Sequence, residues 1–218
     1  MELVLGALVL VAAAWLFGGI TEDVVSGDPL TQVDVVVANW FASHATPALT
    51  QAMLTISSIH GPIPVTAMVC GLGLFLVWQR QWHWFITFLI AVPGGVLLNA
   101  LVKEAVHRPR PHFSDLVLTL TTYSFPSGHA AAATLFYGFL AAYVTVHLRA
   151  WRWRVLVGFI AFLAVVLVGL SRIYLRVHYL SDALGGMTEG VAWLALSIMA
   201  IRTLGHRTRD NGRPGAAD

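Results

Sequence analysis

The sequence predicts an all-α integral membrane protein, built as a bundle of six transmembrane helices. Its 218 residues are 57% hydrophobic and only 11% charged, whereas soluble domains carry about 25% charged residues. Apolar stretches with almost no charge recur six times, and each approaches the length of about 20 residues that a helix needs to cross a bilayer. The alternation typical of a membrane β-barrel is absent, so the spans are predicted to be helices.

The elements follow in order along the chain. The first stretch, residues 3–20, lacks a preceding basic segment and a following small-residue cleavage site, so it is predicted to be a retained helix rather than a signal peptide. Residues 21–61 are predicted to form an outer loop with a short amphipathic helix at 33–41. The remaining spans are predicted at residues 62–79, 84–102, 130–147, 153–170 and 183–201.

These spans are predicted to form a single domain, residues 1–204, followed by a disordered cytoplasmic tail, residues 205–218, that is rich in Arg, Gly and Pro. Cytoplasmic segments of membrane proteins are enriched in Lys and Arg. Both termini are therefore predicted to be cytoplasmic, in a protein of the bacterial inner membrane, and segments 103–129 and 171–182 to be extracytoplasmic. The basic residues behind this orientation are Arg149, Arg152, Arg154, Arg202, Arg207, Arg209 and Arg213.

The composition also argues against several classes of function. A net charge of +2 divided among short loops gives no basic stripe, so no nucleic-acid partner is expected. Cys70 is the only cysteine, which rules out a disulfide framework. The acids near the extracytoplasmic motifs, such as Glu104 and Asp115, are scattered, so neither a metal site nor a cofactor is predicted.

Three motifs fall on the predicted extracytoplasmic face. The first is Lys103 followed after six residues by Arg110-Pro111, and the second is Pro126-Ser127-Gly128-His129 at the start of the fourth span. The third is Arg172, with His178 and Asp182 after it, between the fifth and sixth spans. The predicted topology brings all three motifs to one place.

These residue types suit an anionic phosphate. Lys103, Arg110 and Arg172 supply three cations, and guanidinium groups bind phosphate through paired hydrogen bonds. Ser127 and Gly128 stand at a predicted helix start, where free backbone amides and the positive end of the helix dipole attract anions. The motifs therefore predict a phosphate-binding site.

The two histidines predict covalent chemistry at that site. His178 and Asp182 are four residues apart, so their side chains would share one face if the sixth helix began near His178. A carboxylate on one imidazole nitrogen fixes the tautomer and leaves the other nitrogen free to attack phosphorus. His129 is then the second imidazole, able to protonate the leaving oxygen and later to activate water.

Each motif alone also has an ordinary structural explanation. Lys103 and Arg172 are placed where basic side chains extend from a helix end towards water, and Pro-Ser is a common helix start. His178 and Asp182 would also fit an interfacial pair. Only the gathering of all these residues on one membrane face favours the catalytic interpretation.

With these residues in view, the sequence resembles the type 2 phosphatidic acid phosphatase superfamily, which shares its site with vanadium haloperoxidases and bacterial class A acid phosphatases. The three motifs match the three-part signature of that family in order and spacing, and the resemblance is close from about the third span to the sixth. It implies that His178 is the nucleophile, Asp182 its orienting carboxylate and His129 the general acid. It further implies phosphate binding by Lys103, Arg110, Ser127, Gly128 and Arg172, with no metal.

The expected function is hydrolysis of a lipid phosphate or diphosphate through a phosphohistidine, since the predicted site is level with lipid headgroups. Undecaprenyl diphosphate, phosphatidylglycerol phosphate and phosphatidic acid all fit as substrates, and the oligomeric state stays open. The alternatives are a lipid phosphotransferase and a non-catalytic lipid-phosphate transporter.

Three features lie outside the signature. Arg108 is interpreted either as an aid to a second phosphate or as a solvated loop residue. Glu189 is predicted to face the bundle near the outer interface, where it would pair with a cation of the site. Gly186 and Gly190 indicate close packing of the last helix.

Overall fold

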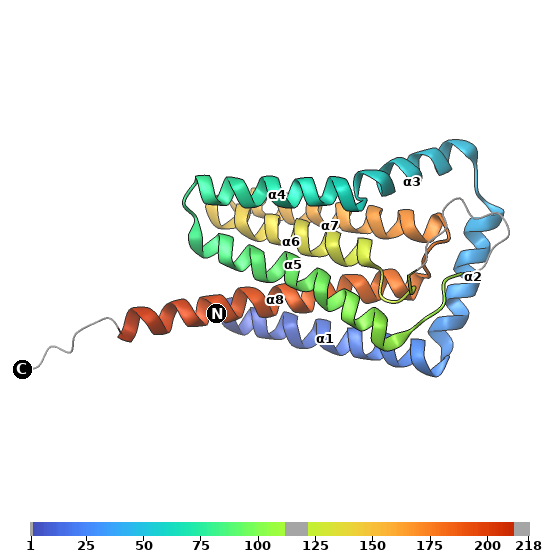
Figure 1. Cartoon of the computed structure of the whole chain (residues 1–218), viewed down its shortest axis with the longest axis horizontal. Helices are drawn as coiled ribbons and strands as arrows, with labels where there is room; N and C mark the ends of the chain where they lie inside the picture. The colour runs from blue at the N-terminus through green and yellow to red at the C-terminus, as the bar shows by residue number, and fades with distance from the viewer. Residues whose placement is uncertain (1, 112–121, 212–218) are drawn as a thin grey trace, which may run out of the picture.

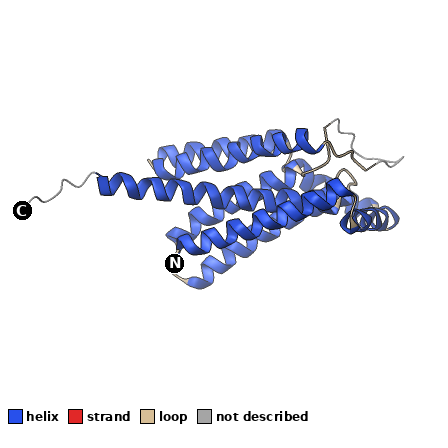
Figure 2. Cartoon of the chain, turned by 90° about the horizontal axis from the view of Figure 1, so that it is seen from below, coloured by secondary structure: helices blue, strands red, loops and turns tan. Residues whose placement is uncertain are grey.

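The computed structural model describes residues 2–111 and 122–211, and within those ranges every regular element is a helix. The eight helices are α1 (Glu2–Ser26), α2 (Pro29–Ser43), α3 (Pro47–Ile59), α4 (Pro62–Trp78), α5 (Trp82–Val106), α6 (Gly128–His147), α7 (Trp151–Tyr174) and α8 (Leu180–Asn211). The long helices run side by side as an elongated bundle (Figures 1 and 2). The prediction of an all-helical membrane protein is therefore confirmed.

Each of the six predicted spans is helical. Five helices are long and apolar enough to cross a membrane on their own. The 17-residue α4 meets that test only together with α3, from which it is separated by a bend of 44°. Large apolar side chains cover the outside of the bundle, including Trp15 and Phe162, which are 77% and 62% exposed. An apolar outer surface of this kind is compatible with lipid rather than with water.

The segment predicted as an outer loop contains two helices. The predicted amphipathic helix is present as α2, which lies across one end of the bundle of long helices (Figure 1). α3 was not predicted. It begins at Pro47, after the N-cap residue Thr46, whose hydroxyl accepts a hydrogen bond from the amide of Leu49, and it packs against α7. The start of α1 and the end of α8 lie at the opposite end of the bundle from α2 (Figure 1).

α8 packs against five of the other helices, α1, α2, α5, α6 and α7. The two predicted packing glycines lie on it. A Cβ at Gly186 would stand 2.4 Å from the carbonyl oxygen of Ser127, and one at Gly190 would stand 2.9 Å from Thr134. The absence of side chains here lets α8 approach the start of α6, so the close-packing interpretation is confirmed.

The predicted domain boundary after residue 204 does not coincide with a helix end. α8 continues through the first part of the predicted tail to Asn211, and residues 212–218 lie outside the described residues. At the other end of the bundle α5 stops at His107, whose positive φ of 54° is a left-handed conformation that histidine adopts more readily than most residues. This turn directs the following residues, Arg108 and Arg110, towards the ends of α7 and α8.

Candidate active site

Backbone hydrogen bonds join the three motifs at the end of the bundle that α2 covers. The amide of Ser124 donates to the carbonyl of Arg108 at 2.8 Å, which ties the segment before α6 to the segment after α5. The amide of Ser127 donates to the carbonyl of Asp182 at 2.9 Å, which ties the start of α6 to α8. The structure thus brings together motifs whose outermost residues, Lys103 and Asp182, are 79 positions apart in the sequence.

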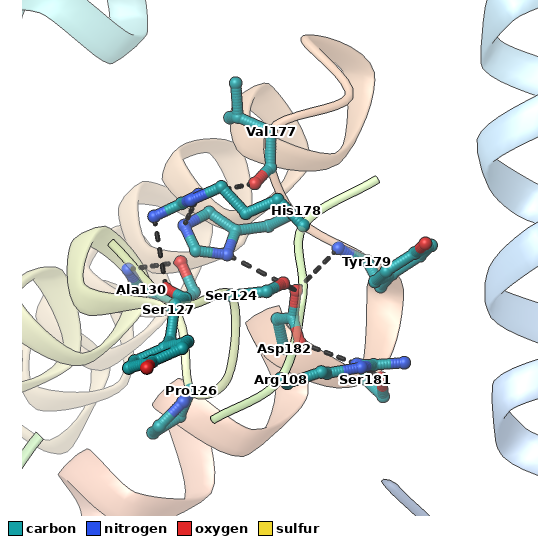
Figure 3. A network of polar contacts seen from close by, with 12 residues as sticks. Arg108, Ser124, Pro126, Ser127, Ala130, Val177, His178, Tyr179, Ser181 and Asp182 are labelled. Carbon is teal, nitrogen blue, oxygen red and sulfur yellow. Dashed lines mark hydrogen bonds and ion pairs between the residues drawn. The ribbon is translucent and has the colours of Figure 1, made fainter. Parts of the chain in front are cut away.

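His178 and Asp182 form the centre of this cluster (Figure 3). His178 Nδ1 lies 3.3 Å from Asp182 Oδ2. The same oxygen accepts hydrogen bonds from the amide of Tyr179 at 2.8 Å and from the Ser124 hydroxyl. α8 begins at Leu180, so His178 precedes the helix rather than lying in its first turn. The pair forms nevertheless, because the residues before the helix fold back over the carboxylate.

The environment of His178 favours a neutral imidazole. The side chain is 2% exposed, and burial lowers the pKa of His178 to about 4, although hydrogen bonding to Asp182 acts in the opposite direction. With Nδ1 facing a carboxylate, the proton of the neutral ring is assigned to Nδ1. Nε2 therefore carries the lone pair.

Arg110 faces that second nitrogen. Its Nη1 lies 3.3 Å from His178 Nε2 and donates to the carbonyl of Val177 at 2.6 Å. The other side of the guanidinium group is held by Thr122, whose carbonyl accepts from Nε at 2.6 Å and whose hydroxyl accepts from Nη2 at 2.9 Å. A fixed, forked cation beside a nitrogen lone pair is an arrangement that can bind an anion at the point of attack.

Arg172 is the most deeply buried of the three predicted phosphate-binding cations. It lies in the last turn of α7, is 2% exposed, and donates from Nη1 to the hydroxyl of Ser57 on α3. Its Nε is buried and has no hydrogen-bond partner within residues 2–111 and 122–211. A buried charged donor without an acceptor is costly, so this part of the site is suited to binding an anion.

Lys103 holds the backbone that leads into α6. Its ammonium group donates to the carbonyls of Tyr123 at 3.0 Å, Ser124 at 3.4 Å and Pro126 at 2.5 Å. Lys103 thereby fixes the approach to Ser127 and places a positive charge beneath it. Electrostatic coupling of Lys103 to Arg110, Arg172 and Asp182 puts all these groups in one region.

The start of α6 has the features of an anion site. Ser127 is fully buried and is the N-cap residue, with its hydroxyl accepting from the amide of Ala130. Gly128 occupies the first helical position, where a Cβ would stand 3.2 Å from Asn99 Oδ1. His129 follows in the first turn and is electrostatically coupled to Arg172 and His178.

His129 also lines an apolar cavity of about 470 Å³ between α4, α5 and α6. Most of the cavity wall is formed by aliphatic residues such as Val65, Val69 and Val96. His60, which was not predicted to belong to the site, lies at the same cavity and pairs through Nε2 with the hydroxyl of Tyr137 at 2.7 Å. The cavity therefore joins a polar end at His129 to an apolar interior.

The two charges outside the motifs have buried partners. Arg108 is not a solvated loop residue: its side chain is 10% exposed, and it donates to Asp182 Oδ1 at 2.6 Å and to Asp34 Oδ2 at 2.7 Å. Glu189 faces the bundle as predicted, and its Oε2 accepts from the side-chain amide of Asn99 at 2.7 Å. Asp34, Ser57, Asn99, Ser124 and Ser181 thus take part in the site without any sequence motif that marks them.

The donor set of the site is basic. Within the described part of the chain, no three His, Cys, Asp or Glu side chains gather at a spacing that would hold a metal ion. The carboxylates nearest the motifs are already bonded to histidine, arginine, serine or asparagine.

Comparisons with known proteins agree with this geometry. The model of the PAP2 superfamily matches residues 82–205, a range that includes all three motifs. Phosphatidylglycerophosphatase B of Bacillus subtilis is 36% identical over 125 residues, which cover 57% of this chain and 60% of that protein. Undecaprenyl-diphosphatase of Sulfolobus acidocaldarius is 30% identical over 148 residues, 66% of this chain and 64% of its own length.

A solved structure extends the likeness to nearly the whole chain. The crystal structure of a transmembrane PAP2-type phosphatidylglycerolphosphate phosphatase from Bacillus subtilis superposes with a TM-score of 0.78 at 25% identity, covering 91% of this chain and 96% of that one. The chain spans about three fifths of the length of the first curated relatives that it matches.

Proposed function

Because the chain belongs to the PAP2 superfamily, whose model spans residues 82–205, we propose that it is a membrane phosphatase that hydrolyses a lipid phosphate or diphosphate through a phosphohistidine at His178. The relatives are named as phosphatases of phosphatidylglycerophosphate and undecaprenyl diphosphate, which supports a lipid phosphate as substrate.

The buried guanidinium group of Arg172 is the observation that carries the proposal. Within the described residues its Nε has no hydrogen-bond partner. The fork of Arg110 lies beside His178 Nε2, and Lys103 holds the backbone that leads into α6. The carboxylate of Asp182 is already shared between Arg108 and His178. Cations outnumber anions here in a setting largely closed to water. A phosphate group supplies the missing negative charge, and phosphoryl transfer needs this kind of charge stabilisation.

The first half of the proposed reaction forms a covalent intermediate. The lone pair of His178 Nε2 attacks phosphorus in line with the leaving oxygen, the new P–N bond forms, and the bond from phosphorus to that oxygen breaks. His129 donates its proton to the departing oxygen, so the lipid leaves as a neutral hydroxyl or as a lipid monophosphate. Asp182 Oδ2 holds the Nδ1–H of the positively charged ring.

The second half returns the enzyme to its starting state. His129, now neutral, accepts a proton from water as the water oxygen attacks the phosphorus. The P–N bond breaks, its electron pair returns to Nε2, and inorganic phosphate is released. No metal ion takes part in either half of the proposal.

The cavity next to His129 supports a lipid rather than a soluble substrate. Its volume of about 470 Å³ and aliphatic wall suit the apolar part of a lipid whose headgroup reaches the motifs. We further propose six spans, with α3 and α4 together counted as one, both termini cytoplasmic and the site extracytoplasmic. Arg149, Arg152 and Arg154, between α6 and α7, support that orientation through the positive-inside rule.

The proposal is tested by measuring phosphate release from a panel of lipid mono- and diphosphates by the purified protein in detergent. Wild-type protein should release phosphate, also in the presence of EDTA, and should carry acid-labile, base-stable phosphate after a rapid quench. His178→Ala should lose at least about 10⁴-fold in rate, comparable to the loss of a triad member elsewhere. Release that is unchanged in His178→Ala would overturn the mechanism, and transfer of phosphate to lipid hydroxyls instead of water would identify a phosphotransferase.

A further inference from the structure

Arg108 connects the proposed catalytic pair to a helix outside the segment that the family model matches. Its guanidinium group lies between two carboxylates, Asp182 Oδ1 at 2.6 Å and Asp34 Oδ2 at 2.7 Å. Both carboxylates are fully buried, and the arginine side chain is 10% exposed. Asp34 belongs to α2, the helix that crosses the end of the bundle, whereas the family model begins at residue 82.

Asp34 also holds the residue next to Asp182. Its Oδ1 accepts from the backbone amide of Ser181 at 2.8 Å, and its Oδ2 accepts from the Ser181 hydroxyl. Arg108 donates to the same hydroxyl at 2.6 Å (Figure 3). One carboxylate of α2 therefore fixes both the cation that binds Asp182 and the backbone from which Asp182 projects.

Because these charged groups are buried, the loss of any one of them should be costly to the others. A fully buried carboxylate is strongly unfavourable unless it is paired, and the loss of one partner leaves the other charge uncompensated. Without the charge of Asp34, Arg108 would remain 2.6 Å from Asp182 with its positive charge opposed by that carboxylate alone. It would then compete with His178 for the negative charge of Asp182, above all when phosphorylation makes the imidazole positive.

The two oxygens of Asp182 have different partners. Oδ1 accepts from Arg108, while Oδ2 accepts from Tyr179 and Ser124 and faces His178. The position of Arg108 thus sets the rotation of the carboxylate and, through it, the distance from Oδ2 to Nδ1. Arg108 is itself held by Asp34 on its far side.

We propose that Asp34 is a positioning residue for the His178–Asp182 pair, acting through Arg108 and Ser181, so that α2 completes the site from outside the matched segment. This inference rests on the proposed phosphatase function. It assigns the amphipathic helix a task in catalysis: it fixes the orientation and the effective charge of the carboxylate that holds the nucleophile. Asp34 touches no substrate in this scheme.

The test compares Asp34→Asn with Asp28→Asn in the full-length protein. Asp28 is an exposed acid at the start of the same helix and makes no side-chain capping bond, so it is a matched control for loss of an acid. Asp34→Asn should lower kcat about 10- to 100-fold. This is the range found in metal sites when a residue that orients a metal ligand is mutated. KM should stay within about twofold, and phosphohistidine formation in a rapid quench should slow in parallel with kcat. Asp28→Asn should match the wild type.

A double variant separates positioning from general damage to the fold. If Asp34 acts through Arg108, the double variant Asp34→Asn/Arg108→Gln should be no slower than Arg108→Gln alone. Ser181→Ala, which leaves both charges in place, covers the case in which Asp34→Asn fails to fold, and it should show the same kcat-specific loss in weaker form.

The outcomes distinguish this inference from the proposed function. A wild-type protein without phosphatase activity contradicts the proposed function itself. An active wild type in which Asp34→Asn or Ser181→Ala behaves like Asp28→Asn overturns the positioning role. A rise in KM at unchanged kcat would also overturn the positioning role. So would a double variant whose loss of kcat equals the product of the losses from Asp34→Asn and Arg108→Gln.

Discussion

His178 lies in a protein environment that keeps its imidazole neutral where a free histidine would be substantially charged. The ring is almost completely buried between Asp182 and Arg110. Burial penalises a charged ring, Asp182 holds the proton on Nδ1, and Arg110 adds a smaller opposition to protonation of Nε2. If His178 is the nucleophile, as proposed, it should be ready to attack over a wide pH range, including mildly acidic conditions.

A titration measures this property directly. The pKa of His178 should be near 4 in the folded protein, compared with about 6.5 for an unperturbed histidine. NMR of ¹⁵N-labelled histidines, with the His178 signal assigned from its absence in His178→Asn, provides the measurement. A midpoint at or above 6.5 would contradict the burial argument.

The same shift has a consequence for stability. Between about pH 6.5 and pH 4 the unfolded chain binds a proton at His178 that the folded protein does not bind. The contribution of this group to the free energy of unfolding is therefore present above pH 6.5 and is lost as the pH falls towards 4. Replacing His178 with Asn should flatten the acid side of a plot of melting temperature against pH, and an unchanged plot would count against the shift.

Replacing His129 tests its two proposed roles, as the proton donor to the leaving oxygen and as the base that activates water. In His129→Ala, a substrate such as p-nitrophenyl phosphate, whose leaving group needs no proton, should still phosphorylate His178. It should give a burst of about one nitrophenolate per enzyme, followed by slow turnover. A lipid phosphate, whose leaving oxygen needs the proton, should give no burst and lose about 10²- to 10⁴-fold in rate. His147→Ala, at the other end of α6, is the control, and equal losses with both substrates would argue against the assignment.

The contact between α6 and α8 places the start of α6, the proposed phosphate-binding segment, against Asp182. Gly186 makes this contact possible, because a methyl group there would stand 2.4 Å from the backbone oxygen of Ser127. Backbone cannot move away as the end of a flexible side chain can. The distance between the two helices is thus part of the geometry of the site.

Gly186→Ala should therefore destabilise the protein by about 1–3 kcal/mol, the usual effect of overpacking, and should lower phosphatase activity. Gly158→Ala is the matched control, because a Cβ at Gly158 has no atom within 4 Å among its surroundings. Alanine has the higher helix propensity, so this control should be neutral or slightly stabilising. Thermal unfolding in detergent checks both, and equal melting temperatures would show that α8 can shift to accept the methyl group.

The amphipathic helix α2 and the unpredicted helix α3 show where sequence patterns stop being informative. α3 begins with Thr46-Pro47, an ordinary helix start, but its Thr, Gln and Ser residues keep it below the apolarity of a membrane span. The partners Ser57 and Asp34 are each one of several polar residues in these helices. Nothing in their spacing distinguishes a buried side chain from an exposed one, since the distinction arises only when α3 packs on α7 and α2 packs on α8.

Over the whole molecule, the features predictable from sequence were those set by local composition or by fixed spacing. The length of the apolar stretches predicted six helices. Because the chain reverses direction between successive helices, the three motifs indicated which helix ends would meet on one face. The partners of Arg108 were not predictable, since Asp34 and Asp182 each lie 74 residues away, on either side. A long-range ion pair of this kind follows from the assembled bundle rather than from any segment of it.

The orientation of the bundle in the membrane gives the last prediction. The segment around Asp28 and α2 is acidic, whereas the segment between α6 and α7 carries Arg149, Arg152 and Arg154. Positive residues are retained on the cytoplasmic side, so α2 and the site should face outward. In a Cys70→Ala background, a membrane-impermeant thiol reagent applied to intact cells should label Asp28→Cys and not Arg149→Cys, with both labelled after permeabilisation. The reverse pattern would place the phosphate site in the cytoplasm, and the substrate would then have to be a lipid phosphate of the inner leaflet.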